Sequence, residues 1–324
     1  MKVAVTGAGG FIGAYLTRQL AAQGHDVVAI DTFLRGRPSR LADMSGNVIV
    51  VETDVRDRSA LSSAFEGVKA VFHLAAVNGT ENFYKHPQLV LDVGVRGALA
   101  VVEASIDAGV PDLIVASSAE VYQTPAIVPT PETIDMIIPD SLNPRYSYGG
   151  SKLISELITF NYGRDAFRKV QVFRPHNVYG PDMGWKHVIP QLIDKVQTAV
   201  ANGSNKIVLQ GDGSETRAFC YVDDIVNGIC TMWRHGETMN VYHIGTAEEV
   251  AIKELAVLIA NRMGAEITLV TGAAAEGATP RRCPDISKLA KLGYTPQVSL
   301  AEGVDRTIRW YVDNPQPADS NTLL

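Results

Sequence analysis

The 324-residue sequence is longer than most single domains, and it predicts one large domain with a smaller lobe. Hydrophobic residues make up 46% and charged residues 20% of it, a globular composition that excludes a disordered or fibrous chain. The formal net charge of -6 excludes general nucleic-acid binding through a basic surface, although a few arginines can still bind a phosphate.

Three sequence features predict a cytoplasmic protein. No apolar run is long enough to span a bilayer, so we expect no membrane association. A strand-like run begins directly after Met1, with no apolar signal segment before it. The three cysteines, Cys220, Cys230 and Cys283, cannot all pair and show no CxxC spacing, which favours reduced thiols.

The first half of the chain alternates short β-branched runs with helix-length amphipathic stretches. We predict five buried strands and a sixth that extends their sheet, namely Val3–Thr6, Val27–Ile30, Val48–Val51, Ala70–Leu74, Leu113–Ala116 and Val170–Phe173. This alternation predicts an α/β fold with a doubly wound parallel sheet, the Rossmann arrangement, covered by helices on both faces.

After Arg174 the pattern changes to loops, short strands and helices. We expect helices around Val188–Ala201, Asp224–Trp233, Ile252–Met263 and Leu300–Tyr311. The predicted division is a first domain over 1–174, with segments near 215–245 returning to it, and a smaller α/β lobe over 175–214 and 246–314. Residues 315–324 are predicted to form a loose tail.

The segment TGAGGFIG, residues 6–13, follows the first predicted strand and opens the first predicted helix. Gly7, Gly10 and Gly13 allow a tight turn, close approach of the backbone to a pyrophosphate, and close packing of helix on strand. The helix N-terminus offers free amides and a positive dipole end to phosphates. Because the glycines have the required strand and helix beside them, they predict a dinucleotide site.

The predicted cofactor is NAD. Asp31 ends the second predicted strand, where a carboxylate binds the ribose hydroxyls of adenosine and repels the 2′-phosphate of NADP. Arg35 and Arg37 follow closely and could accommodate that phosphate, so they weaken the argument. Asp54-Val55 are expected beside the adenine, and an aspartate there could also cap the helix predicted over Ser59–Phe65.

Tyr148 and Lys152 stand four residues apart in YGGSK, a spacing that places both on one helix face, about 6 Å apart at Cβ. A phenol has a pKa near 10, so it acts as a base at neutral pH only if its pKa is lowered to about 7. That shift requires the phenolate to be stabilised by ~4 kcal/mol. A nearby ammonium and oxidised nicotinamide can supply that stabilisation. Lys152 can also hold the nicotinamide ribose. Ser118 follows the fifth predicted strand at the ligand-binding edge of the sheet, where it could guide a substrate proton to Tyr148.

The chain resembles the extended short-chain dehydrogenase/reductase family, in its nucleotide-sugar epimerase/dehydratase branch, from about Met1 to Tyr311. The resemblance rests on Asp31 and on TGAGGFIG (6–13), HLAA (73–76), SSAEVY (117–122), YGGSK (148–152), RPHNVYGP (174–181), GDGSETRAFCYVDD (211–224) and TPRRCPDISKLAKLGYTP (279–296). It implies that the first domain binds NAD and that the lobe binds a nucleoside diphosphate sugar. It also implies a homodimer paired through the helices at 88–110 and 153–160, whose apolar stripes we expect to face the core.

The resemblance implies two sets of binding residues. For NAD these are Gly7, Gly10, Phe11, Ile12, Gly13, Asp31, Phe33, Asp54, Val55, Leu74, Ala75, Ala76, Ser117, Tyr148 and Lys152. For the nucleotide sugar they are Asn78, Thr80, Asn177, Val188, Arg217, Arg281 and Arg282.

Within the substrate set, Asn177 is expected to contact the diphosphate or the sugar. Arg217 and one of Arg281 and Arg282 are expected to clamp the diphosphate, which suits planar bidentate donors. The alternatives are a solvated loop charge for Arg217 and a surface salt bridge for the arginine pair. Asp223-Asp224 are expected to cap the following helix.

Three histidines, His73, His176 and His187, lack the HxxxH or HExxH spacing of a metal site. We therefore expect each to be a satisfied core or wall residue, and we predict no metal.

Glu120 bears on which reaction follows oxidation at C4, because a 4-keto sugar has acidic C3 and C5 hydrogens. The resemblance implies that simple 4-epimerases have Ser or Thr at this position. It implies Glu in UDP-glucuronate decarboxylases and in 4,6-dehydratases, where the Glu is the base that removes the C5 proton. Many dehydratases have an acid where this chain has Ala119, and decarboxylases usually have Arg where it has Asp182. Residues 176–186 and 244–250 faintly resemble GDP-mannose 3,5-epimerases. A carboxylate without a catalytic role is the remaining alternative.

The predicted function is an NAD-dependent nucleotide-sugar epimerase that acts through a 4-keto intermediate and returns the hydride internally. A 4,6-dehydratase that uses Glu120 as base is the first alternative, and a UDP-glucuronate decarboxylase is less favoured. A catalytically silent NAD-binding sensor or scaffold is the alternative from another class, although the Tyr148–Lys152 pair argues against it.

Overall fold

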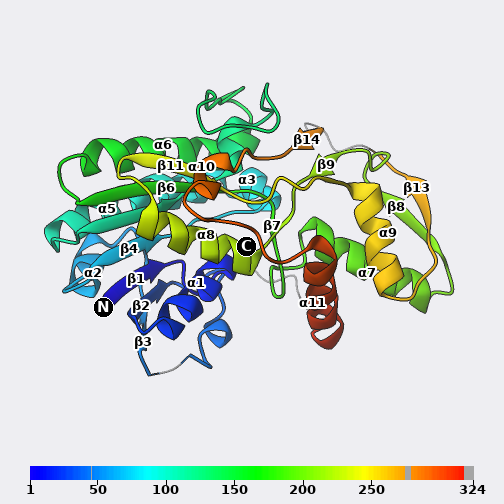
Figure 1. Cartoon of the computed structure of the whole chain (residues 1–324), viewed down its shortest axis with the longest axis horizontal. Helices are drawn as coiled ribbons and strands as arrows, with labels where there is room; N and C mark the ends of the chain where they lie inside the picture. Colours follow the sequence, from blue (N-terminus) through cyan, green and yellow to red (C-terminus); the bar gives the residue numbers. More distant parts are fainter. Residues whose placement is uncertain (45, 274–278, 317–324) are drawn as a thin grey trace.

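The computed structural model describes residues 1–44, 46–273 and 279–316. Its centre is a seven-stranded sheet of order β11-β6-β5-β4-β1-β2-β3, in which neighbouring strands run parallel (Figure 1). The strands are β1 Lys2–Thr6, β2 Asp26–Asp31, β3 Val48–Glu52, β4 Ala70–His73, β5 Asp112–Ala116, β6 Lys169–Pro175 and β11 Asn240–Ile244. The predicted doubly wound α/β fold is confirmed.

Helices cover both faces of this sheet. They are α1 Phe11–Ala22 and α8 Val222–His235 on one face, and α2 Arg58–Ala64, α5 Ala98–Asp107 and α6 Ser147–Gly163 on the other. The alternation of β1 separates the two layers, because Val3 and Val5 pack in the core with α1 and α8 while Ala4 packs in the core with α2 and α5.

The predicted strand Val48–Val51 is present but is not buried. It forms β3 at the edge of the sheet, where Ile49 is 62% and Val50 47% exposed. An apolar run predicts a strand, but it does not distinguish an edge strand from a central one.

The segment before α5 is not a continuous α-helix. α4 (Pro87–Leu91) leads into a π-helical turn, η2 (Asp92–Gly97), and then into α5. This turn brings the chain very close to α6, since a Cβ on Gly94 would lie 2.6 Å from the Ser151 side chain. π turns are rare and often lie at functional sites.

The prediction that the apolar stripe of 153–160 faces the core holds for Ile158 and Phe160, which pack against it, but not for Ile154 and Leu157. On α6 the buried residues include Lys152, Ser155, Glu156 and Thr159, whereas Ile154 is 38% and Leu157 52% exposed. The buried hydroxyls are satisfied within the helix, for example from Thr159 Oγ1 to the Ser155 carbonyl at 2.7 Å. The inner face of α6 therefore carries many polar groups, and Ile154 and Leu157 lie on its outer face.

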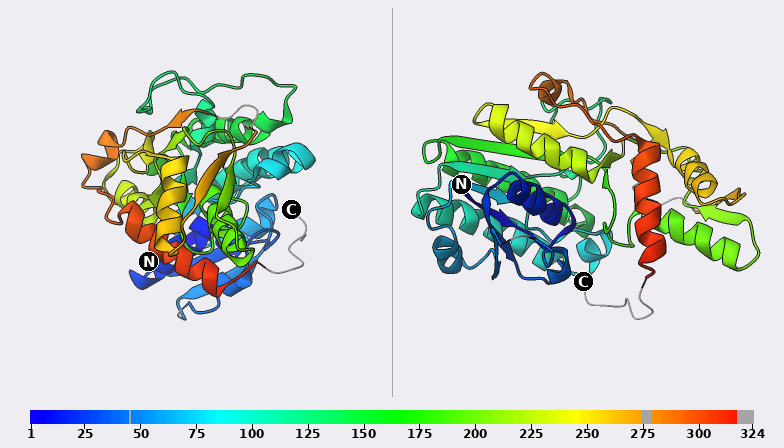
Figure 2. Two further views of the ribbon diagram at one scale, coloured as in Figure 1. Left: turned by 90° about the vertical axis from the view of Figure 1, so that its right-hand side faces the viewer. Right: turned by 60° about the horizontal axis from the view of Figure 1, so that its bottom comes forward.

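The smaller lobe has a hydrophobic core of its own, formed largely by α7 Val188–Ala201, α9 Ile252–Arg262 and α11 Leu300–Asp313 (Figures 1 and 2). These agree closely with the helices predicted there. The lobe's strands are short, and they are β7 Val178–Tyr179, β8 Lys206–Leu209, β9 Thr216–Arg217, β10 Cys220–Tyr221, β12 Val250–Ala251, β13 Thr268–Thr271 and β14 Arg281–Arg282. Of the predicted tail, 317–324 lies outside the described residues.

Short helices complete the fold. They are η1 Pro38–Arg40, α3 Thr80–Lys85, η3 Ala119–Tyr122, η4 Pro144–Tyr146 and α10 Ser287–Ala290. Within the described ranges, no helix has the length and apolarity needed to cross a bilayer.

Two predicted helix caps are wrong. Asp57, rather than Asp54, caps α2 by accepting from the Ala60 amide at 3.0 Å. Asp224 lies inside the first turn of α8 and is buried, and its carboxylate accepts from the amides of Gln297 and Val298. Asp224 therefore ties α8 to the segment that leads into α11.

Candidate functional site

The glycine loop between β1 and α1 is packed too closely for side chains. Gly7 has φ +73°, and a Cβ there would lie 2.8 Å from the Ala75 amide nitrogen. A Cβ on Gly13 would lie 2.0 Å from the Gly7 carbonyl oxygen. Gly10 precedes α1, so the first amides of that helix point out of its N-terminal end and have no acceptors within the helix. This is the cradle that a pyrophosphate needs.

Asp31 lies beside this cradle. Its carboxylate accepts from the Gly9 amide at 2.9 Å and from the Phe33 amide at 2.7 Å, which fixes it at the end of β2. The Phe33 ring covers Gly9, because a Cβ on Gly9 would lie 2.7 Å from a carbon of that ring. A fixed carboxylate near free helix amides fits the adenosine ribose and diphosphate of NAD.

Of the other predicted cofactor residues, some lie at the glycine loop and others are hydrogen-bonded to groups elsewhere in the protein. Leu74 and Ala75 lie directly beside the glycine loop, since their amides donate to the Thr6 carbonyl and the Thr6 hydroxyl. Ser117 turns away, because its hydroxyl donates to the buried Glu156 carboxylate. Asp54 accepts from Arg56.

Tyr148 is buried at the start of α6. Its ring stacks on Phe83 of α3, with centroids 5.2 Å apart and planes 13° apart, and its hydroxyl shares a hydrogen bond with Ser118. Burial raises the pKa of Tyr148 to about 12, and the Ser118 hydrogen bond opposes that rise. Without NAD the phenol is therefore protonated at neutral pH.

The Lys152 ammonium lies near the Tyr148 ring but makes its hydrogen bond to the backbone. It donates to the Ala116 carbonyl at 2.7 Å and lies 5.8 Å from the centroid of the Tyr148 ring. Burial lowers the pKa of Lys152 to about 8, and Glu156 opposes that fall. The main acidifying influence on Tyr148 in the protein alone is Ser118.

Gly149 explains how η3 reaches the tyrosine. A Cβ on Gly149 would lie 2.5 Å from Gln123 Nε2 and 2.8 Å from the Glu120 carbonyl oxygen. The helix that carries Tyr148 can therefore touch the 3-10 turn that carries Glu120 only because this residue is glycine.

Glu120 is ion-paired with Arg282, its Oε1 accepting from Arg282 at 2.6 Å, and the two side chains are 27% and 15% exposed. Burial favours the neutral acid, but Arg282 and then Arg145 and Arg217 outweigh it and lower the pKa of Glu120. Glu120 is therefore a paired carboxylate and not an exposed one at the end of a strand.

The two neighbouring arginines point to different partners. Arg281 forms a bidentate pair with Glu249 and is half exposed, which is the surface salt bridge considered above. Arg217 is partly buried, and its charge reaches both Glu120 and Arg282. Arg282 and Arg217 are therefore the two arginines of the predicted substrate set that lie near Glu120.

Four further residues were assigned to the sugar nucleotide. Asn177, with φ 37°, donates to the Ala218 carbonyl at 3.4 Å, and Asn78 accepts from Asn82 at 2.9 Å through its carbonyl. Thr80 begins α3 and Val188 begins α7.

The histidines differ from one another. His73 is satisfied as predicted, with Nδ1 2.7 Å from the Thr6 hydroxyl. His176 is buried, but neither ring nitrogen has a hydrogen-bond partner among the described residues, so the prediction that it is satisfied is wrong. Burial, and then His243, lowers the pKa of His176 far below its usual value. Among the described residues no three potential ligands gather as a metal site would require.

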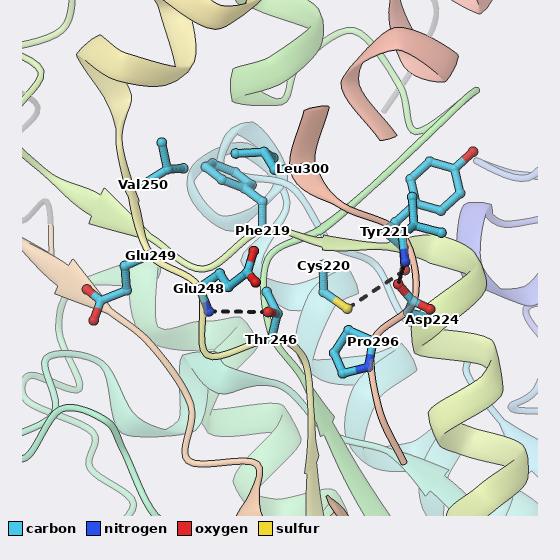
Figure 3. A pocket seen from close by; sticks show the side chains of 11 residues that line it. Phe219, Cys220, Tyr221, Asp224, Thr246, Glu248, Glu249, Val250, Pro296 and Leu300 are labelled. Atoms are coloured by element: carbon cyan, nitrogen blue, oxygen red, sulfur yellow. Dashed lines mark hydrogen bonds between the residues drawn. The ribbon is translucent and has the colours of Figure 1, made fainter. Parts of the chain in front are cut away.

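A cavity of about 190 Å³ lies apart from these residues, between β10, β12 and the segment before α11 (Figure 3). Its lining includes Phe219, Asp224, Glu248 and Glu249. None of the predicted site residues lines it.

Sequence reasoning missed Phe83, Gly149 and the Arg282–Glu120 pair. Phe83 gave no signal, because an aromatic residue in a short amphipathic segment usually belongs to the core. Gly149 is in the quoted YGGSK motif, but its packing role depends on where η3 lies.

The family model described as "NAD dependent epimerase/dehydratase family" matches residues 3–245. The UDP-N-acetyl-alpha-D-glucosaminuronate decarboxylase of Bacillus cytotoxicus is 28% identical over 95% of this chain and 96% of that protein. The dTDP-glucose 4,6-dehydratase of Streptomyces venezuelae, solved with NAD, is 30% identical with a TM-score of 0.85, covering 97% of this chain and 98% of that one. The UDP-glucose 4-epimerase of Thermotoga maritima, solved with UDP-glucose, is 27% identical with a TM-score of 0.85, covering 97% and 99%.

Proposed function

This chain belongs to the NAD-dependent epimerase/dehydratase family and is an NAD-dependent enzyme, and from that premise we propose that it is a nucleotide-sugar epimerase. Its proposed reaction oxidises C4 of the sugar to a transient ketone and returns the hydride to the other face, so that the two transfers leave NAD unchanged. Its relatives act on nucleotide sugars but catalyse different reactions, namely decarboxylation, 4,6-dehydration and 4-epimerisation.

Tyr148 is the proposed acid and base. NAD, when bound, supplies the hydride acceptor and a positive charge beside the phenol, which offsets the burial that raises the pKa of Tyr148. Ser118, hydrogen-bonded to Tyr148, relays the proton of the C4 hydroxyl. Lys152 holds the nicotinamide ribose. Gly7, Gly10, Gly13 and Asp31 hold the rest of the cofactor.

Arg282 and Arg217 are the proposed diphosphate clamp, with Asn177 beside them. Both guanidiniums are partly buried near Glu120, and their planar donors suit the oxygens of a diphosphate. Arg281 is left out of this clamp because Glu249 already pairs with it.

The observation that carries the choice of epimerase is the Arg282–Glu120 pair. A base at C5 must be free and of raised pKa, whereas Glu120 accepts from Arg282 and has a lowered pKa. The neighbouring position, where an acid could protonate a departing hydroxyl, is Ala119. Tyr148 and Ser118 suffice for two opposite hydride transfers, which need no base at C5.

A 4,6-dehydratase is the second candidate, because of where Glu120 lies. Its charge reaches the Tyr148 hydroxyl, and a substrate diphosphate that competes for Arg282 would release the carboxylate beside the sugar. A freed Glu120 could then take the C5 proton.

The test starts with thermal shift of UDP-, GDP-, CDP- and dTDP-sugars in the presence of NAD. The sugar that binds is then incubated with the enzyme in D2O and followed by NMR. We expect the C4 epimer, no accumulation of NADH and no deuterium at C5. A 4-keto-6-deoxy product with deuterium at C5 would establish the dehydratase instead. Tyr148→Phe should lower turnover by about 10²–10⁴, and Tyr162→Phe, on an exposed tyrosine of the same helix, should not.

The boundaries of the two parts are also proposed, with 1–174 binding NAD and 175–214 and 246–314 binding substrate. The positions of α8 and β11 support the return of the later part of 215–245 to the first domain, whereas β9 and β10 belong to the sheets of the lobe. The exposed apolar face of α6, with Ile154 and Leu157, supports a homodimer through this helix. The buried, unpaired cysteines are compatible with a cytoplasmic location.

A further inference from the structure

The loop that follows β2 carries Arg35, Arg37 and Arg40, and we call residues 32–40 the arginine loop. It is attached to the glycine loop, because the Arg37 amide and Arg40 each donate to the Gly9 carbonyl at 2.9 Å. The arginine loop therefore starts at the adenosine end of the cofactor site and packs against Gly9 of the glycine loop.

Asp182 anchors the far side of the arginine loop. It follows β7, at the start of the substrate lobe, and its carboxylate pairs with both Arg37 and Arg40. Arg40 donates from Nε to the carboxylate and from a terminal nitrogen to the Asp182 carbonyl, each at 2.7 Å. The carboxylate is only 18% exposed, so this pair is screened little by solvent. One aspartate therefore ties the loop across the junction of the two parts of the molecule.

Arg35 differs from its two neighbours because it has no carboxylate partner among the described residues. Its guanidinium donates to the Asn78 carbonyl and lies 3.5 Å from where a Cβ of Gly79 would be. Its charge acts on Tyr148 and on His187, so its guanidinium lies near both side chains. Arg35 nevertheless remains exposed to solvent. A cation is thus held without a counter-ion along the path from Asp31 to Tyr148.

We propose that the arginine loop retains NAD during turnover, with Arg35 binding the cofactor diphosphate and Asp182 acting as the positioning residue that holds the loop closed. The amides of α1 would bind one side of the diphosphate, and the planar guanidinium would supply donors from the other. Arg37 and Arg40 are already engaged in ion pairs with Asp182 and hold the loop in place, whereas Arg35 has no carboxylate partner among the described residues. An enzyme that must take back its own hydride gains from such slow cofactor release.

Asp182→Asn tests the fastening. Asparagine keeps the size and tolerates the left-handed φ of 62°, so the charge is the main change. The matched control is Asp107→Asn, which removes a comparable Arg58–aspartate pair on the surface. The measurements are the rate of NADH release by fluorescence and the NAD content of the dialysed protein. We expect release about tenfold faster in Asp182→Asn and unchanged in Asp107→Asn. Release at the wild-type rate in both variants overturns the proposal.

Arg35→Met tests the diphosphate contact without any substrate, so its result is independent of which sugar reaction the enzyme performs. The probes are NAD, ADP and adenosine, measured by calorimetry. We expect NAD and ADP to bind on the order of tenfold more weakly and adenosine to bind as in the wild type, with Arg35→Lys in between. Equal weakening of adenosine, or wild-type binding of all three probes, contradicts a role for Arg35 at the diphosphate.

Discussion

The cofactor half and the proposed substrate half of this site are built from different groups. The cofactor half consists of backbone: glycines packed within 3 Å of neighbouring main chain, the first amides of α1, and one carboxylate held by amides. The substrate half consists of charged side chains brought from η3, β9 and β14, which are far apart in the sequence.

The difference lies in what each half does without a ligand. The first backbone amides of a helix have no hydrogen-bond acceptors within the helix, so the cofactor half keeps its shape and its free donors when no ligand is bound. Arg282 and Glu120 do satisfy one another, so substrate must compete with an ion pair already present. Ligand binding by the cofactor half should therefore be sensitive to substitutions that change its shape. Ligand binding by the substrate half should be sensitive to substitutions that change its charge.

The largest effect is expected from a single methyl group in the cofactor half. Gly13→Ala places a Cβ 2.0 Å from the Gly7 carbonyl oxygen, so the glycine loop must move. We expect about 3 kcal/mol of lost NAD binding, or roughly a hundredfold by calorimetry. Gly46→Ala, where a Cβ meets nothing within 4 Å, is the control. Tight NAD binding by Gly13→Ala would show that shape does not limit this half.

In the substrate half, removal of one charge should be the sensitive change. Arg282→Met deletes a proposed diphosphate donor and leaves Glu120 unpaired and partly buried. We expect about 2 kcal/mol weaker binding of the nucleoside diphosphate, roughly thirtyfold. Arg281→Met removes the exposed Arg281–Glu249 pair on the neighbouring residue and should change binding of the nucleoside diphosphate less than about threefold. Similar losses in both variants would mean that the two arginines share the clamp.

The point where the two halves meet should respond in turnover rather than in binding. Gly149→Ala places a Cβ 2.5 Å from Gln123 Nε2 and should push η3 from Tyr148, which lowers kcat about tenfold and leaves NAD binding unchanged. Gly150→Ala meets only ordinary contact with Ile138 at 3.5 Å and should stabilise α6 by up to ~1 kcal/mol. A normal kcat in Gly149→Ala would remove the link between this packing and catalysis.

The smallest effect is expected in the pH dependence of stability. Arg282 helps to lower the folded-state pKa of Glu120 below its ordinary value of 4.5, so the pair stabilises the fold fully above that value. The stabilisation is lost as pH falls through the lower folded-state pKa. Because the pair is partly exposed, we expect less than about 1 kcal/mol. Urea midpoints at several pH values should therefore fall more steeply below pH 4.5 in wild type than in Glu120→Gln, and parallel curves would contradict the pairing.

The sequence predicted the cofactor half well because its signals are local. TGAGGFIG determines its own turn, and the next strand brings Asp31 to it. The Arg282–Glu120 pair joins residues whose sequence separation is 162, and no local pattern reports such a contact. The same limit applies to Phe83 against Tyr148, and to Asp182, which appeared only as a departure from a motif.

The α6 helix shows a second limit of prediction. Periodicity predicted the helix itself and the stripe of Ile154 and Leu157, but an apolar stripe can face either the core or another molecule. Here the inner face carries Lys152, which donates to the Ala116 carbonyl, and Glu156, which accepts from Ser117 and Arg174. Ile154 and Leu157 therefore lie on the outer face.

The π-helical turn at Asp92–Gly97 has a consequence for how related chains are compared and altered. A turn closed by i→i+5 bonds holds one residue more than an α-turn, so aligning this stretch with an uninterrupted α-helix requires a gap of one position. Deleting one residue there would convert the turn to α-helix and rotate the preceding residues by about 100° relative to α5. Gly94, which leaves room for Ser151 at the helix that bears the tyrosine, would then no longer face it.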